Sequence, residues 1–238
     1  MKLKVISCLA ALAVCVVLPA AGQTGRAPAA TARLVQEGKA NLQSGKVSQA
    51  VRVLEKAAKS APRDGAVQLE LGIAYKKSKQ YTKARTALTK AWRYARGTPI
   101  AAQANRELLS LPADILRPQP KQLVARFRGR RIAPAGLVRV KLLAFTASWA
   151  EPCKQLQAAI DKARTEWGDK VEFVSVDVDD PKNESLLDQY DVSPVPTVVF
   201  LDEEGNMVSF LIGYGGEDAL NHHLRTLTSG AKPPGPTG

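Results

Sequence analysis

Small and apolar residues recur at an interval of 34 positions between residues 31 and about 98. The matched pairs are Gly38 and Gly72, Ala50 and Ala84, Leu54 and Leu88, and Ala57 and Ala91. Within one copy, residues such as Ala50, Leu54 and Ala57 lie three or four positions apart, which is the spacing of one helix face. Breaks at residues 42–46, at Pro62 and at residues 76–79 separate the helical stretches. The pattern therefore predicts two successive helical hairpins.

A further helix is predicted over residues 99–111, where Ala102, Leu108 and Leu109 would form the inner face. This helix would cap the hairpins and complete a helical domain over residues 31–111. Prolines and glycines then mark residues 112–136 as a linker in which helix cannot persist. One short strand is expected there, at residues 123–127. Four arginines make the linker basic: Arg126, Arg128, Arg130 and Arg131.

From residue 137 the pattern changes to short apolar strands that alternate with helices. Strands are predicted at residues 138–145, 171–178, 198–201 and 207–212, and helices after residue 153, at 183–190 and at 217–227. The first of these helices places Leu156, Ala159, Ile160 and Ala163 on one face. The order β-α-β-α-β-β-α predicts an α/β domain over residues 137–229. The Pro- and Gly-rich residues 230–238 are expected to form a disordered tail.

The first residues have the composition of a secretory signal peptide. Lys2 and Lys4 precede an apolar run at residues 5–18, and small residues follow it at 20–22. We therefore expect a signal peptide at residues 1–22, export to the periplasm or the cell exterior, and no membrane span after cleavage. An uncleaved N-terminal anchor is the alternative, and a lipoprotein is the weaker one. Cleavage would leave Cys153 as the sole cysteine, so the mature chain would form no intramolecular disulfide.

Charge is distributed unevenly along the chain. Residues 26–111 carry 17 Lys and Arg against 5 Asp and Glu, whereas residues 142–230 carry 6 against 16. Two explanations follow: the two halves dock on each other, or the basic half binds an acidic partner. Added salt should loosen a dock that is held by charge. A nucleic-acid partner is not expected, because an exported protein seldom meets one and only Phe127 interleaves the linker arginines.

The two halves resemble two known families. The 34-residue period is similar to that of the tetratricopeptide repeat, in which small residues let paired helices approach closely. The stretch Trp149-Ala150-Glu151-Pro152-Cys153-Lys154 and the later Val195-Pro196-Thr197 resemble the thioredoxin family. This resemblance implies a three-layer α/β/α domain and a cis bond before Pro196, which lies 43 residues after Cys153. The expected fold class is thus α plus α/β: helical repeats followed by a thioredoxin-like domain.

The departures from the thioredoxin pattern bear on function. By the resemblance, Ala150 stands where the family has its nucleophilic cysteine, and a methyl group cannot attack a disulfide. The family's buried aspartate corresponds to Ala144, and its partner lysine corresponds to Ser175. Cys153 is then either a small buried side chain or a monothiol whose thiolate Lys154 and the helix N-terminus would favour. We favour the buried, structural cysteine.

We expect no metal and no cofactor. His222 and His223 are adjacent on a predicted helix and so point to different faces of it, and no companion ligand lies at a suitable spacing.

These observations predict an exported binding or scaffold protein that has lost dithiol redox activity. The repeats would present a concave basic groove to an acidic protein or peptide. The face around Trp149 and Pro196 would keep the backbone edge that holds extended peptide in this fold. The alternative is a thiol-disulfide oxidoreductase, or a client-trapping protein, that uses Cys153 alone and an external resolving thiol.

Overall fold

The computed structural model describes residues 29–118, 140–202 and 205–229. The expected signal peptide, the linker arginines, the possible strand at 123–127 and the C-terminal tail lie outside these residues. Within them, no helix is both long enough and apolar enough to span a bilayer.

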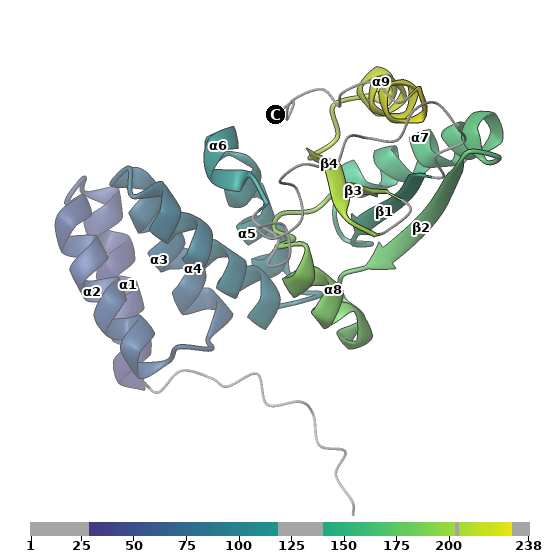
Figure 1. Ribbon diagram of the computed structural model, residues 1–238. Coiled ribbons are helices and arrows are strands. Elements are labelled where there is room, and N and C mark those ends of the chain that lie inside the picture. Colours follow the sequence, from purple (N-terminus) through teal and green to yellow (C-terminus); the bar gives the residue numbers. More distant parts are fainter. Residues whose placement is uncertain (1–28, 119–139, 203–204, 230–238) are drawn as a thin grey trace, which may run out of the picture.

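Five helices of ordinary length build the N-terminal half (Figure 1). Their bounds are α1 Ala29–Gln43, α2 Val47–Ser60, α3 Gly65–Lys77, α4 Tyr81–Tyr94 and α5 Pro99–Leu109. The helices α1 and α2 pair, as do α3 and α4, so the 34-residue period corresponds to one helical hairpin. Asp64 caps α3, because its carboxylate accepts from the backbone N–H groups of Ala66 and Val67.

The repeated glycines explain how closely the paired helices approach. A Cβ at Gly38 would lie 2.5 Å from Cγ of Leu54, and one at Gly72 would lie 2.6 Å from Cγ of Leu88. Both leucines are fully buried. The same residue pair therefore closes each hairpin, one repeat apart.

The end of the helical half differs from the prediction in two ways. The buried face of α5 consists of Ala101, Ala104, Asn105 and Leu108, whereas Ala102 and Leu109 are only half-buried. A short helix, α6 (Ala113–Leu116), follows in the stretch where helix was not expected. Pro112 stands immediately before it, where the fixed φ of proline suits a helix start.

The C-terminal half is a four-stranded sheet in the order β2-β1-β3-β4. Its strands are β1 Val140–Thr146, β2 Val171–Asp177, β3 Thr197–Leu201 and β4 Met207–Ile212. The first two are parallel, and β3 runs antiparallel to both β1 and β4. Its helices are α7 Glu151–Trp167, the 3₁₀ turn η1 Pro181–Asn183, α8 Glu184–Gln189 and α9 Glu217–Thr228.

The two faces of the sheet are covered differently (Figure 1). Leu142 and Ala144 of β1 face a core shared with α7 and α9. Leu143 and Phe145 face the other core, which contains Leu187 of α8 and runs without a break into the helical repeats. This larger core includes buried residues of every helix from α1 to α6. The repeats and the sheet thus share one hydrophobic core.

His223 is the buried titratable group of the α9 face. Its side chain is 1% exposed and stacks on Phe200, with 5.6 Å between ring centroids. Nδ1 lies 3.0 Å from the carbonyl oxygen of Ala219, and Nε2 is buried without a partner among the described residues. Burial lowers the pKa of the imidazole, because the charged form loses its hydration there.

Protonation of His223 should therefore destabilise the fold. Above the unfolded pKa of about 6.5 the ring is neutral in both states, so it adds no pH dependence. Below that pH the unfolded chain binds the proton more readily, so the free energy of unfolding falls by up to about 1.4 kcal/mol per pH unit. Urea unfolding between about pH 7 and pH 5 measures this slope. The slope should flatten in His223→Phe and persist in a control at the exposed His222, His222→Gln; equal slopes in wild type and His223→Phe would contradict it.

The close approach at Gly72 gives a second prediction. Gly72→Ala forces its methyl group against Leu88, and the overlap should outweigh the roughly 1 kcal/mol that alanine adds in helix propensity. We expect a net loss of about 1–2 kcal/mol in the free energy of unfolding, measured by urea denaturation. Gly215→Ala is a control for an added methyl group without a close contact, since Gly215 lies in the loop before α9 and its Cβ would meet its nearest neighbour at an ordinary 3.4 Å. Equal stability of the two variants would show that the hairpin tolerates a wider approach.

Candidate functional site

The motif around Trp149 lies where β1 gives way to α7. The strand ends at Thr146, a turn follows, and Ala150 is the N-cap residue of α7 with no side-chain hydrogen bond. Cys153 is the third residue of the helix. The indole Nε1–H of Trp149 donates to Oδ2 of Asp179 at 2.7 Å, which fixes the turn against the residues after β2.

Cys153 is a free, buried thiol with 4% of its surface exposed. Burial raises its pKa to about 11; the backbone N–H of Ala147, 3.5 Å from Sγ, lowers the pKa, and the charge of Asp179 raises it. At neutral pH the group is a thiol rather than a thiolate. Lys154 does not change this, because its Nζ forms an exposed ion pair with Glu151 at 2.8 Å.

Two of the positions that depart from the family pattern are occupied by buried alanines. Ala150 is 5% exposed and Ala144 is 1% exposed. Ala144 and Ser175 are register partners on β1 and β2, so the two positions singled out in the sequence are indeed neighbours in the sheet. Neither carries a group that titrates.

The Pro196 loop lies at the start of β3. The Val195–Pro196 bond is cis, as the sequence predicts, and the Ser193–Pro194 bond is also cis. The Thr197 hydroxyl donates to the carbonyl oxygen of Pro194 at 2.7 Å. Val195 is completely buried, which is unexpected for a backbone edge that was predicted to be open to a peptide.

The group that buries this edge is Asn105 of α5. Its Nδ2–H donates to the carbonyl oxygen of Val195 at 2.7 Å, and its Oδ1 accepts from the N–H of Val195 at 2.8 Å. Sequence reasoning missed this contact. The available signal is an asparagine on a helix face otherwise made of Ala101, Ala104 and Leu108, where an unpaired carboxamide would be costly.

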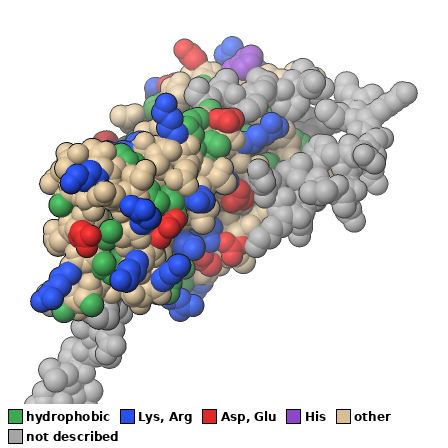
Figure 2. All heavy atoms as spheres, turned by 90° about the vertical axis from the view of Figure 1, so that its left-hand side faces the viewer, with side chains coloured by type: hydrophobic (Ala, Val, Ile, Leu, Met, Phe, Trp, Pro, Cys, Tyr) green, Lys and Arg blue, Asp and Glu red, His purple; other side chains and the backbone are tan. Residues whose placement is uncertain are grey.

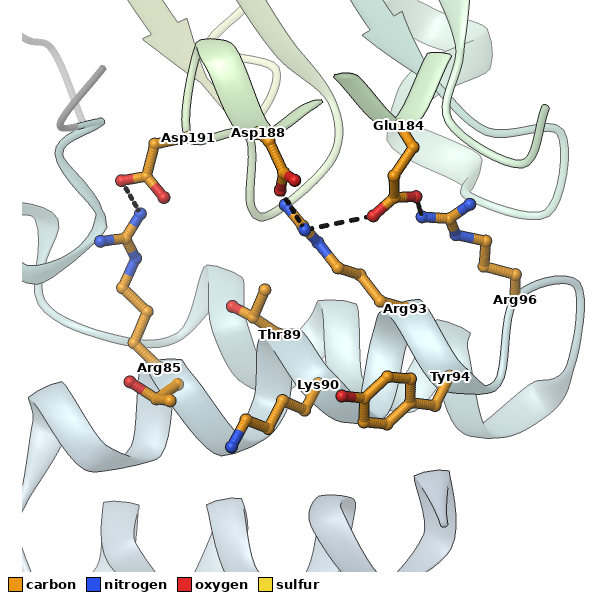
Figure 3. Close-up of a pocket in the computed structure, with 10 residues that line it drawn as sticks. Arg85, Thr89, Lys90, Arg93, Tyr94, Arg96, Glu184, Asp188 and Asp191 are labelled. Atoms are coloured by element: carbon orange, nitrogen blue, oxygen red, sulfur yellow. Dashed lines mark hydrogen bonds and ion pairs between the residues drawn. The ribbon is translucent and has the colours of Figure 1, made fainter. Parts of the chain in front are cut away.

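Charged contacts join the two halves beside this edge (Figure 3). Arg85 pairs with Asp191 at 2.7 Å, and Arg93 pairs with Asp188 at 2.5 Å and with Glu184 at 3.3 Å. Arg96 also pairs with Glu184. In each pair the arginine belongs to the basic half and the carboxylate to the acidic half, so the intramolecular docking suggested by the charge distribution is present.

These ion pairs line a cleft of about 640 Å³ between α4 and α8. Figure 3 shows the arginines reaching from the α4 side towards the carboxylates, while Lys90 and Tyr94 lie lower along the same helix. The hydroxyl groups of Thr89 and Ser193 are 2.7 Å apart and continue the contact. Because each guanidinium already has a carboxylate partner, the cleft is mainly a seam between the halves.

Metal ligands are not clustered in the part of the chain that the structure describes. Residues 29–118, 140–202 and 205–229 contain no group of three or more His, Cys, Asp or Glu placed to hold an ion. His222 is exposed and His223 is buried, so the adjacent pair does not converge.

Comparisons with known proteins match the two halves separately. The tetratricopeptide repeat model matches residues 41–109 and the thioredoxin model matches residues 137–226. A thioredoxin of Bacillus subtilis is 34% identical over 89 residues, which are 36% of this chain and 83% of that protein. A chloroplastic thioredoxin-like protein of Arabidopsis thaliana is 35% identical over 86 residues, 36% of this chain; the match spans only 33% of that protein. The solved structure of the germline-specific thioredoxin Deadhead of Drosophila melanogaster is 26% identical, with 37% of this chain and 81% of that one aligned at a TM-score of 0.35.

Proposed function

The chain belongs to the thioredoxin family, and on that premise we propose that it is an exported, non-redox member that binds an acidic protein through its helical repeats. In this proposal the thioredoxin domain supports the repeats and catalyses no disulfide exchange. Export rests on the composition of residues 1–22.

The loss of redox activity is supported chiefly by the state of the one thiol in the described part of the chain. Disulfide exchange begins with attack by an accessible thiolate. Cys153 is 4% exposed, and the raised pKa of about 11 leaves it protonated. Ala150 stands where the family pattern has its nucleophilic cysteine, and its side chain is only a methyl group. No nucleophile is therefore available at either position.

The binding role is supported by the basic surface of the repeats. Arg52, Lys56 and Lys59 are spaced i, i+4 and i+7, so they share one stripe of α2, and all three are exposed. Among the described residues none of the three has an ion-pair partner, in contrast with Arg85 and Arg93 at the seam. Figure 2 shows the end of the molecule formed by the repeats, where Lys and Arg side chains are scattered over a largely uncharged surface.

The stripe on α2 is a different surface from the concave groove suggested by the sequence. The first helix of each hairpin, α1 or α3, carries both ion-paired and unpaired cations. There Lys39 pairs with Glu70 at 2.9 Å, and Lys76 pairs with Glu107 at 2.6 Å. Arg33 of α1 and Lys77 of α3 are exposed and make no ion pair among the described residues, but they lie on different helices. The three cations of the stripe lie together on one helix face, so we place the acidic partner there.

Redox activity is tested by insulin reduction with the wild-type chain. We expect no turnover above that of Cys153→Ala. We also expect native alkylation by iodoacetamide at pH 7 to be slow, since a pKa of about 11 leaves roughly one thiol in ten thousand ionised. Alkylation should become fast only after denaturation. The variant Ala150→Cys, which restores a second thiol, is the positive control for the assay. Turnover by wild type that Cys153→Ala loses would instead favour the monothiol oxidoreductase.

The binding surface is tested with fluorescently labelled poly-glutamate as an acidic probe. Charge reversal at Arg52, Lys56 and Lys59 together should weaken binding by about tenfold or more at low salt, as measured by anisotropy. The matched control reverses three exposed charges of the thioredoxin domain that make no ion pair among the described residues: Lys170, Lys182 and Arg225. If both triple variants weaken binding equally, the probe senses only net charge and the stripe is not a site.

A further inference from the structure

The backbone of Val195 is held by a single side chain from the other half of the molecule. One carboxamide, that of Asn105, both accepts from the N–H of Val195 at 2.8 Å and donates to its carbonyl oxygen at 2.7 Å. Asn105 is 3% exposed and Val195 is fully buried, so neither group can pair with bulk water. The contact spans 90 positions of sequence.

This pairing has the form of a contact between two strands. In an antiparallel pair, one residue exchanges both of its backbone hydrogen bonds with one partner residue. The Asn105 carboxamide is a primary amide, and like a peptide group it supplies a carbonyl acceptor and an N–H donor. Val195 also lies between Pro194 and Pro196, which have no N–H, so it provides the only backbone donor of this short segment.

The surroundings hold the carboxamide in place. Leu108, one turn beyond Asn105, is fully buried in the core that also contains Val195. Half-buried Leu109 lies beside the loop after β4, because a Cβ added at Gly213 would lie 3.6 Å from its Cδ2. The hydroxyls of Thr89 and Ser193 meet two residues before Val195.

We propose that α5 closes a peptide-binding edge, with Asn105 as an internal substitute for the backbone of an extended peptide. The repeats and an extended polypeptide compete for Val195, and the edge accepts its partner only when α5 is displaced. The partner is recognised through backbone hydrogen bonds, so any extended chain with free N–H and C=O groups fits. This closure is independent of the acidic partner proposed for α2 and of the redox state of Cys153.

The first experiment compares full-length Asn105→Ala with Gln103→Ala. Gln103 is the matched control, since it is a carboxamide on the same helix that makes no hydrogen bond within the described residues. Hydrogen exchange at the Val195 N–H should be about tenfold or more faster in Asn105→Ala than in wild type, and unchanged in Gln103→Ala. Reduced, carbamidomethylated lysozyme, a permanently unfolded basic chain that the stripe on α2 should not attract, is the binding probe. It should bind Asn105→Ala at least about tenfold more tightly than wild type.

Two results would overturn the proposal. Exchange at Val195 that is the same in Asn105→Ala and Gln103→Ala would show that the carboxamide does not protect the edge. Fast exchange without any gain in probe binding would show that the opened edge accepts no peptide.

A reversible lock covers the case in which Asn105→Ala fails to fold. Thr89→Cys and Ser193→Cys place two thiols where the hydroxyls now meet, in a chain whose Cys8, Cys15 and Cys153 are replaced by serine. Oxidation forms a disulfide between the repeats and the thioredoxin domain, which should abolish probe binding and make exchange at Val195 slower. Reduction should restore probe binding and return exchange to its former rate. Equal binding by the oxidised and reduced forms would show that displacement of the repeats does not control the edge.

Discussion

The pairing of Asn105 with Val195 is the contact on which the arrangement of the whole chain depends. A buried N–H and a buried C=O each need a partner, because an unpaired backbone group in a dry core costs about 1–3 kcal/mol. Pro194 and Pro196 have no backbone N–H, so the N–H of Val195 is the only backbone donor of these three residues. As long as no other chain supplies these hydrogen bonds, the helix that carries Asn105 is held against this edge, and the repeats before it keep one orientation.

This contact also explains how so short a repeat stack is stable. Two hairpins leave one face of the last helix pair uncovered, and repeat proteins usually need about three units or a polar cap. Here α5 covers that face on one side, and on the other its Asn105 pairs with Val195 and its Leu109 lies beside Gly213. The expected capping helix is thus present, but its outer face is an interface rather than a solvated surface.

The sequence predicted the parts of the fold that depend on local pattern. The helix pairs followed from the 34-residue period, and Gly38 and Gly72 proved to be the positions where the helices meet most closely. The strand and helix order of the second half followed from its apolar runs. The partner of Asn105 could not be predicted, since it lies 90 positions away; the apolar helix face around Asn105 indicates only that its carboxamide needs a buried partner. The same holds for α5 as a whole: Ala102 and Leu109 were assigned to its inner face, because the helical period was known but the direction of the sheet was not.

Ion pairs and apolar burial both stabilise the contact between the repeats and the thioredoxin domain. The sizes of their free-energy contributions decide which one keeps the two halves together. The ion pairs of Arg85, Arg93 and Arg96 involve carboxylates that are 34–46% exposed, so each contributes about 0–1 kcal/mol and is screened by salt. Full burial of one leucine such as Leu108 contributes about 1.5–3 kcal/mol and is not screened. The opposite charges of the two halves therefore orient the approach, whereas the shared core and the buried carboxamide keep the halves together. It follows that salt alone does not separate them, and that a partner which opens the edge has to replace hydrogen bonds and apolar contacts rather than compete for charge.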